Sequence, residues 1–368
     1  MPFADELLGA PAAQTLTRGL QQAAPGNPFV AVAGAADNLG ELALRERADL
    51  LRDAILVDLP GDFASLATIV RAAAAADGSF SGWLIWPVAS AVAARAVAED
   101  TAESFDDAMQ LQAELTGRLT AEFSIRTLLQ HDLDRALPIV LEWTASDDEH
   151  VRRLASEGTR PYLPWAIRVR SITANPGVTV PILEALHRDP SEYVRRSVAN
   201  HLNDLSRDHA DLVVETATRW LVDPAPETPA LVRHALRTLV KRGHPGALAV
   251  LGFTPTSTEV EAFTVDTTSV PFGGSVRFSA TVRNTDIVPA RLAIDYVVSH
   301  QKANGTQTSK TFKLTTQALA PGEHLDVARE HSFRAITTRR YYPGAHAVAL
   351  QVNGILSEPL DFELLPPE

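Results

Sequence analysis

Hydrophobic positions follow two different periods along the chain, and the change lies near residue 255. Up to about residue 252, apolar side chains recur at helical spacing between frequent Pro and Gly residues, which predicts a series of short helices. From Thr258 onward, apolar and polar positions alternate in runs rich in Val, Thr, Phe and Ser, which predicts strands. Such runs lie at 258–265, 275–284, 290–299, 308–318, 324–333, 345–352 and 358–364.

The helical part contains a repeat. Three segments align at Val151, Val194 and Val232, and each has an acidic or Pro-containing start, an apolar stripe and Arg beside it. Their spacings of 43 and 38 residues are near the period of HEAT-type helical pairs, which stack because one pair cannot bury its apolar face alone. Further helical pairs are expected before them, at 40–58, 62–76, 88–115 and 118–144.

These patterns predict an α + β multidomain protein. An all-α HEAT-like helical-repeat solenoid occupies residues 1–252, a linker 253–257, and an all-β immunoglobulin-like sandwich 258–368. Within the sandwich, Asn304-Gly305 predicts a type I′ hairpin turn.

A polar stripe is expected on the second repeat helix. Its members are Arg196, Asn200, Asn203, Asp204 and Arg207, at positions i, i+4, i+7, i+8 and i+11. A solvated face is the simplest interpretation. Two Asn residues lower helix propensity, however, and amides are useful where backbone oxygens or bases must be held.

Basic residues gather in two further places. Arg233, Arg237 and Lys241 recur every four residues on the third repeat helix, a stripe suited to a phosphate backbone. In the sandwich, basic residues lie around two connections between strands. They are Lys302, Lys310, Arg339 and Arg340.

Several candidate site residues also have ordinary structural explanations. Glu122 has Arg118 and Arg126 four residues away on either side, and Glu157 has Arg153, so helix-surface ion pairs would account for them. Arg160 lies on the same side as Arg153 and Glu157.

Trp165 follows a Pro-Tyr-Leu-Pro segment that cannot continue a helix. Core filling is the default role of a Trp, and Trp83, Trp86, Trp143 and Trp220 are interpreted in that way. A Trp on a loop beside a basic face could instead stack on a base or sugar.

The amino-acid composition excludes several kinds of catalytic site. The chain has no Cys, which excludes disulfides, thiol nucleophiles and iron–sulfur clusters and favours a reducing compartment. Neither a metal-ligand spacing nor a nucleophile or phosphate-loop motif is present, so an enzyme would work with carboxylates and without cofactor or metal. No run is apolar enough for a membrane span, and we expect a soluble, cytoplasmic monomer.

The net charge of −12 argues at first against a nucleic-acid partner. The excess of acid lies mainly in residues 1–144, which have 9 Lys and Arg against 20 Asp and Glu. Residues 145–245 have 14 against 13. A local basic face is therefore allowed.

Four segments carry a resemblance to a known family. They are Thr120–Arg126, His150–Pro161, Leu163–Trp165 and Asp189–Asp204. In these motifs the chain strongly resembles the AlkC family of DNA alkylation-repair glycosylases, closely over residues 118–245. That family is related to the AlkD glycosylases with their HEAT-like solenoid, and some members carry a C-terminal immunoglobulin-like domain.

The resemblance implies a glycosylase that hydrolyses the N-glycosidic bond of cationic alkylated bases in duplex DNA without base flipping. The expected substrates are chiefly 3-methyladenine and also 3-methylcytosine. The family's active-site positions match Glu122, Glu157, Asp204 and Trp165. Its DNA-facing positions match Arg153, Arg160, Arg196, Asn200 and Asn203.

Two alternatives remain open at this stage. A non-catalytic HEAT-repeat scaffold could bind a protein or nucleic-acid partner, with the acidic residues serving only in surface ion pairs. The sandwich could also serve a separate partner, such as a polysaccharide.

Overall fold

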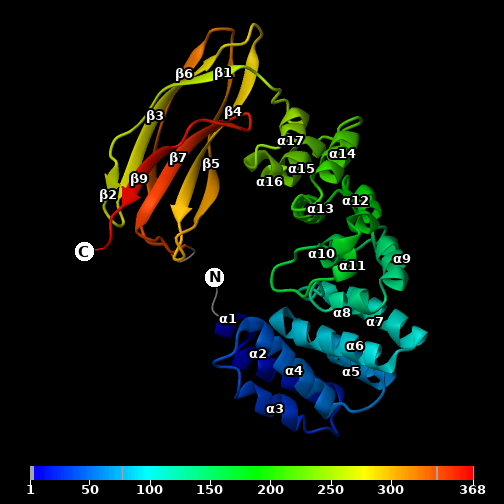
Figure 1. Ribbon diagram of the computed structural model, residues 1–368. Coiled ribbons are helices and arrows are strands. Elements are labelled where there is room, and N and C mark those ends of the chain that lie inside the picture. The colour runs from blue at the N-terminus through cyan, green and yellow to red at the C-terminus, as the bar shows by residue number, and fades with distance from the viewer. Residues whose placement is uncertain (1–3, 77, 337–338, 368) are drawn as a thin grey trace. The chain divides into compact units, whose positions relative to one another are not determined.

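The structure is a computed structural model that describes residues 4–76, 78–336 and 339–367 (Figure 1). The predicted fold class is confirmed, since helices occupy the first part of the chain and strands the second. The helices before the predicted repeat are α1 (Ala4–Leu8), α2 (Ala10–Ala23), α3 (Val30–Ala36), α4 (Leu44–Asp58), α5 (Phe63–Ala76), the 3₁₀ helix η1 (Gly82–Leu84), α6 (Ile85–Glu99), α7 (Ala102–Thr116), α8 (Ile125–His131) and α9 (Leu133–Trp143).

The remaining helices hold the three repeat segments and their partners. They are α10 (Glu149–Gly158), α11 (Arg170–Ala174), η2 (Pro176–Thr179), α12 (Val180–Leu186), α13 (Glu192–Leu205), α14 (Ala210–Trp220), α15 (Thr228–Ala235), α16 (Arg237–Lys241) and α17 (Pro245–Val250).

Two of the predicted helical segments are interrupted. Residues 88–115 contain parts of α6 and α7, because Asp100 adopts a left-handed conformation at the end of α6 and the Thr101 side chain then caps α7. In the segment 118–144, residues 122–124 form a turn rather than a helix. Glu122 therefore lies on a turn in front of α8.

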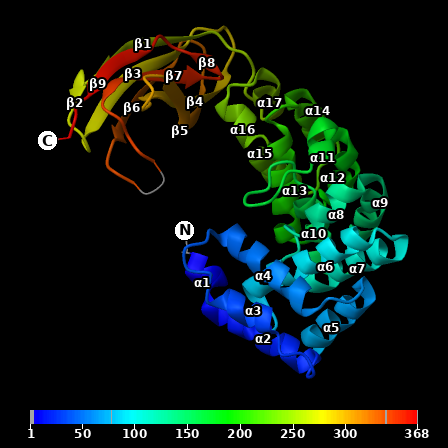
Figure 2. The same ribbon diagram turned by 60° about the horizontal axis from the view of Figure 1, so that its bottom comes forward.

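The first two repeat helices pack against each other in a way that shapes the site. Helix α10 starts at the capping side chain of Asp148, and it contacts α13 along its length (Figure 2). The apolar stripe predicted for the second repeat is buried, since Val194, Val198, Leu202 and Leu205 are each at most 2% exposed. Helix packing thus brings the C-terminal ends of α10 and α13 into one buried region.

The sandwich consists of two sheets. A three-stranded sheet has the order β1 (Thr258–Val265), β3 (Ser275–Asn284), β6 (His324–Ser332). The other sheet has the order β2 (Ser269–Val270), β9 (Leu360–Leu364), β7 (Gly344–Val352), β4 (Ala290–Gln301), β5 (Gln307–Leu319), with β8 (Ile355–Leu356) paired to β7. The two-residue strands β2 and β8 were not predicted.

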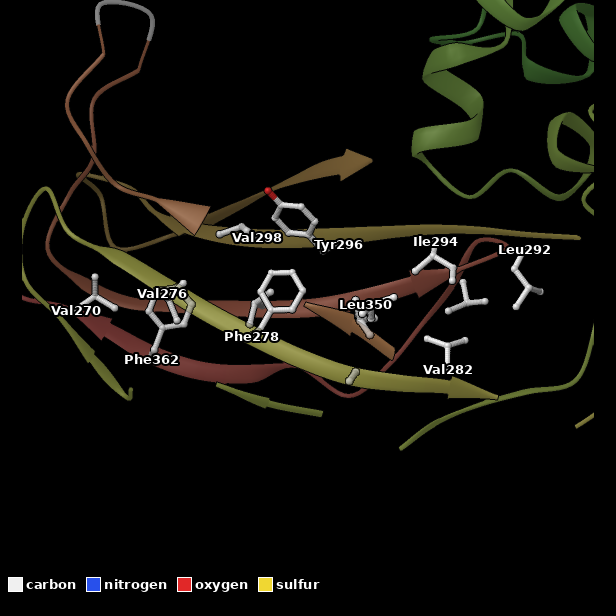
Figure 3. Close-up of a cluster of buried hydrophobic side chains, with 14 of the residues drawn as sticks. Val270, Val276, Phe278, Val282, Leu292, Ile294, Tyr296, Val298, Leu350 and Phe362 are labelled. Atoms are coloured by element: carbon white, nitrogen blue, oxygen red, sulfur yellow. The ribbon is translucent and has the colours of Figure 1, made fainter. Parts of the chain in front are cut away.

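Alternating side chains of the two sheets form the core of the sandwich. Figure 3 shows Phe278 of β3 facing Tyr296 and Leu350 of the other sheet, and all three are buried. The predicted type I′ turn at Asn304-Gly305 is wrong. Only Gly305 has a positive φ, +81°, and its N–H bonds to the carbonyl of Lys302, a type I turn followed by a left-handed glycine.

The chain forms two compact units, and the boundary between them does not coincide with the change from helices to strands. One compact unit comprises the chain up to Arg207 together with Pro224–Leu231, and the other comprises Asp208–Asp223 and the chain from Val232 onward. In the second unit Phe253 is buried with Leu248 of α17 and Ala293 of β4. Phe253 thus belongs to a packed junction, whereas Thr254, Pro255 and Ser257 of the predicted linker 253–257 are exposed. The domain bounds 1–252 and 258–368 stay a proposal based on element type.

Candidate functional site

Three carboxylates from separate segments meet in the first compact unit. Glu122 comes from the turn before α8, Glu157 from the last turn of α10, and Asp204 from the last turn of α13. Their residues are 9%, 5% and 5% exposed. Buried carboxylates are costly unless they are paired, so their partners decide what the cluster can do.

Two arginines join the three carboxylates into a row of alternating charge, here called the carboxylate row. Arg153 donates to Glu122 and lies 3.5 Å from Glu157. Arg160 donates from Nη1 to Oε1 of Glu157 at 2.5 Å and from Nε to Oδ2 of Asp204 at 2.9 Å. The sequence of charges is therefore Glu122, Arg153, Glu157, Arg160, Asp204.

The helix-surface interpretation of Glu122 is wrong. Arg118 donates to the carbonyls of Ala74 and Phe80, and Arg126 donates to those of Gly158, Arg160 and Ile167. Neither is its hydrogen-bonded partner, because Glu122 lies on a turn and not within a helix. Its partner Arg153 comes from α10.

Hydroxyl groups complete the row, and the sequence did not single them out. Ser197 of α13 donates to Oε2 of Glu157 at 2.6 Å, and Thr120 donates to Oε2 of Glu122 at 2.9 Å. His201, fully buried, contacts the carbonyl of Ser156 and the hydroxyl of Thr179. A signal for Ser197 existed, since it precedes Asp204 by seven residues and so shares its helix face.

The carboxylates differ in how well their charge is compensated. Burial would raise the pKa of Glu157, but Arg153, Arg160 and the Ser197 hydroxyl outweigh it, and its pKa lies below the ordinary value. Burial raises the pKa of Asp204, and its bond to Arg160 does not offset that effect. The negative charge of Asp204 is thus less stabilised than that of Glu157.

Trp165 lies on the loop between α10 and α11, as the Pro-rich segment predicted. Its φ is +61°, unusual for a residue other than Gly, and the residue is 48% exposed. The ring meets Trp83 edge-on with centroids 6.2 Å apart. Trp83 in turn approaches Trp86, whose ring stacks on Phe123 at 4.1 Å. An aromatic row therefore connects the exposed Trp165 to the residue next to Glu122.

The polar stripe of α13 is only partly solvated. Arg196 is exposed and Asn200 half-buried, but Asn203 is 9% exposed and buried like Asp204. The solvated-face interpretation is therefore wrong for the C-terminal part of the stripe, because the last turn of α13 faces the end of α10. Arg207 is exposed, and its guanidinium lies 4.2 Å from the ring centre of Tyr162.

The other basic residues lie in the second compact unit. Arg233 and Lys241 are exposed, and Arg237 donates to the carbonyl of His234 at 2.6 Å. Leu236 separates α15 from α16, so the predicted stripe spans two short helices.

In the sandwich, Lys302 and Lys310 lie on either side of the β4–β5 turn, and Lys310 approaches the ring of Phe312. Arg339 and Arg340 line a cavity of about 570 Å³ on the β6–β7 connection. Arg339 also lies within 3.3 Å of a ring nitrogen of His300.

Within the described ranges, no cluster of His, Asp and Glu has the arrangement of a metal site. A search of the same ranges for a helix with the length and hydropathy of a membrane span found none.

Comparison with known proteins connects this arrangement to a family. A family model described as "DNA alkylation repair enzyme" matches residues 95–239, and one for the C-terminal Ig-like domain of "Uncharacterised protein YhaZ" matches residues 259–366. The chain is 33% identical over 325 residues to "Uncharacterized protein YhaZ" of Bacillus subtilis (strain 168), covering 88% of each chain.

A solved structure is similar over nearly the whole length. It is the Pseudomonas fluorescens alkylpurine DNA glycosylase AlkC bound to DNA containing an abasic site analog, with a TM-score of 0.86 and 32% identity. The match covers 99% of this chain and 100% of that chain. The chain therefore belongs to the DNA alkylation repair enzyme family, and within it to the AlkC type with a C-terminal immunoglobulin-like domain.

Proposed function

We propose that this protein is a DNA glycosylase that excises cationic alkylated bases, chiefly 3-methyladenine and also 3-methylcytosine, from duplex DNA without flipping the base. The observation that carries the proposal is the carboxylate row in a chain so similar to an alkylpurine DNA glycosylase. Five charged side chains from three separate segments meet there, and the aromatic row leads from the neighbour of Glu122 to the half-exposed Trp165.

The chemistry explains why carboxylates alone suffice. A base alkylated on a ring nitrogen is positively charged and leaves as a neutral molecule, so it needs little general-acid help. The sugar becomes oxocarbenium-like as the bond breaks, and a carboxylate near its ring stabilises that charge while another group orients water. Trp165 contributes a cation–π interaction of about 0.5–2 kcal/mol with the positive lesion.

Asp204 is the best candidate for the carboxylate at the sugar. Its raised pKa means that its negative charge lacks full compensation, so an approaching cation lowers the energy of the site. Glu157 is held by two arginines and Ser197, and we assign it a supporting role. Because Asp204 and Glu157 have these roles, we assign the orientation of water to Glu122 and the backbone around it.

Basic residues supply the proposed contacts with DNA. Arg196, Asn200 and Asn203 would hold the strand near the lesion, and the basic positions of the second unit would contact phosphates. Those positions are Arg233, Arg237, Lys241, Lys302, Lys310, Arg339 and Arg340. The protein would act as a monomer on alkylated duplex DNA, without cofactor.

One observation favours the scaffold alternative. Every carboxylate of the row is already bonded to an arginine, which is also what a purely structural ion-pair network would show. In that case the protein would bind DNA or a partner protein without cleaving any bond.

Release of free base distinguishes a glycosylase from a non-catalytic scaffold. Purified protein is incubated in excess with duplex DNA treated with a methylating agent, and free 3-methyladenine and 3-methylcytosine are quantified by chromatography. The glycosylase proposal expects release of both, at a rate far above that of the protein-free control. Binding of the DNA without release of any methylated base would instead support the scaffold.

A further inference from the structure

The loop that carries Trp165, residues 159–169, contains neither helix nor strand. Two of its residues, Pro161 and Pro164, lack an N–H. Two of its turn bonds are long, 3.3 Å from the N–H of Arg160 to the carbonyl of Glu157 and 3.4 Å from the N–H of Ala166 to the carbonyl of Leu163. A positive φ is strained for a residue other than Gly, so the backbone of Trp165 keeps this conformation only when its surroundings fix it.

Arg126 supplies that fixation from α8. Its Nη1 donates to the carbonyl of Gly158 at 2.9 Å and to that of Arg160 at 2.8 Å, at the start of the loop. Its Nε donates to the carbonyl of Ile167 at 2.5 Å, at the end of the loop. One guanidinium thus holds both ends, and Trp165 lies between them.

The burial of Arg126 is expensive and indicates a demand for this geometry. The residue is 0% exposed, and burial lowers its pKa to about 10, which leaves it charged at neutral pH. The Nη2 nitrogen of Arg126 has no hydrogen-bond partner among the described residues. A planar fork that reaches two directions is a property of Arg and not of Lys, whose single ammonium acts as a point charge.

Side-chain contacts hold the same loop from outside. The ring of Tyr162 lies 4.2 Å from the guanidinium of Arg207 and 5.2 Å from that of Arg168. Leu163 is 7% exposed. These side-chain contacts add to the support that Arg126 gives to the backbone of the loop.

We infer that Arg126 is a positioning residue for base excision: by holding both ends of the 159–169 loop, it fixes Trp165 and Arg160 in the places that the site requires. This inference rests on the proposed function for its effect on rate, but its effect on the loop is independent of any activity. Arg126 acts through the loop and does not itself touch DNA.

A matched control exists in the same unit. Arg47 is 2% exposed and also donates to three backbone carbonyls, those of Leu42, Leu8 and Gly40. Arg47→Lys therefore removes a similar buried fork at a place outside the carboxylate row and the Trp165 loop. If a buried guanidinium that bonds to backbone carbonyls contributes only to stability, Arg126→Lys and Arg47→Lys should have similar effects on the Trp165 loop and on base release.

The first experiment observes the loop directly in the full-length chain. Five tryptophans labelled with 5-fluorotryptophan give separate ¹⁹F signals, and Trp165→Phe assigns one of them. Arg126→Lys should shift or broaden the Trp165 signal and leave that of Trp220 unchanged, whereas Arg47→Lys should leave both unchanged. If Arg126→Lys does not fold by circular dichroism, Arg126→Gln replaces it. An unchanged Trp165 signal in the folded variant overturns the inference.

The second experiment measures coupling in single-turnover base release. Arg126→Lys should lower the rate by about 10²-fold, the usual cost of a displaced reacting group, and Arg47→Lys by less than about 3-fold. In a Trp165→Ala chain, the effect of Arg126→Lys should shrink at least about 10-fold, because the two changes then affect the same loop. Equal effects in both backgrounds show that Arg126 does not act through Trp165, which contradicts the inference. If the natural chain releases no base, the proposed function fails, and the ¹⁹F result still decides the role of Arg126.

Discussion

Replacement of Asp204 by Asn separates the chemistry of the carboxylate row from its contribution to the fold. Asn keeps the shape of Asp and an oxygen that can accept the bond from Nε of Arg160, now 2.9 Å long. It removes one negative charge at the end of the row where burial raises the pKa of the carboxyl group. Arg160 keeps its bond to Glu157 at 2.5 Å, so no arginine loses its last carboxylate.

The sign of the stability change follows from the direction of the pKa. Burial raises the pKa of Asp204 in the folded chain, so the ionised form of Asp204 is less favourable in the folded chain than in the unfolded chain. Removing the charge relieves that cost and loses one charged hydrogen bond. We expect the free energy of unfolding to change by less than about 1 kcal/mol.

Glu157→Gln should behave in the opposite way. The pKa of Glu157 is lowered, which means that the fold stabilises its charge through Arg153, Arg160 and Ser197. Loss of hydrogen bonds to charged groups costs about 1.5–3 kcal/mol in a buried site, and we expect a destabilisation in that range. Asp204→Asn and Glu157→Gln, two isosteric changes at carboxylates that both bond to Arg160, thus have different effects on the free energy of unfolding.

Activity should follow the chemistry and not the stability. Asp204→Asn should lower single-turnover release of 3-methyladenine by about 10²-fold or more, the scale of losing one electrostatic stabiliser, with little change in DNA affinity. Asp189→Asn is the matched control, since Asp189 is also buried and paired with Arg152 but lies outside the carboxylate row. It should lower stability and leave base release within about 3-fold of the natural chain.

Excision and unfolding are measured on the same preparations, by chromatography of released base and by denaturant titration. Base release by Asp204→Asn at the natural rate would remove Asp204 from the mechanism. An equal loss of rate in Asp189→Asn would show that the effect comes from general destabilisation and would refute the assignment.

The remaining predictions concern pH, the aromatic ring and the phosphate contacts. Since Asp204 must be ionised and its pKa is raised above 3.8, the excision rate should fall as pH drops through that raised value, and the Asn variant should lack this dependence. Trp165→Phe should keep more of the excision rate for a cationic base than Trp165→Leu, because only an aromatic ring gives a cation–π interaction; equal rates would contradict it. Lys241→Ala should reduce the slope of log affinity against log salt by about one unit if Lys241 meets a phosphate, and an unchanged slope would exclude that contact. Burial lowers the pKa of His300 to about 3 and of His331 to about 4, below the ordinary 6.5. The free energy of unfolding of the sandwich should therefore fall by about 1.4 kcal/mol per His between about pH 7.5 and 5.5, and denaturant titrations at those two values check this.

The strands were predictable because their signal is local. Residues 275–284 alternate buried and exposed positions in the sandwich as they alternate apolar and polar residues in the sequence. Strands β2 and β8 contain two residues each and exist through pairing with β9 and β7, partners that are distant in sequence or defined only by the turn between them. A two-residue segment is too short to show a period.

The family resemblance named the carboxylates of the row, whose roles stay proposals, but the sequence did not predict the bonds between them. Periodicity placed Glu122 on a helix with Arg118 and Arg126, whereas the chain turns there and Glu122 pairs with Arg153 instead. An ion pair between residues 31 positions apart depends on how α10 packs, which no local pattern encodes. The contacts of Ser197 with Glu157 have the same origin, since the packing of α10 on α13 creates them.

Alternation of charge explains how an acidic chain can offer carboxylates to a polyanion. The row alternates from Glu122 through Arg153, Glu157 and Arg160 to Asp204, which gives three negative and two positive groups, and the buried Arg126 adds a third positive charge nearby. The region as a whole is close to neutral, so phosphates are not strongly repelled. The sequence of charges ends on Asp204, whose pKa burial raises in spite of Arg160 and Arg207. In the proposed function, the oxocarbenium-like sugar of a cationic lesion brings a positive charge to this end of the row and continues the alternation. A neutral lesion that must leave as an anion places negative charge beside the same row, which is why we expect alkylated cations and not neutral bases to be excised.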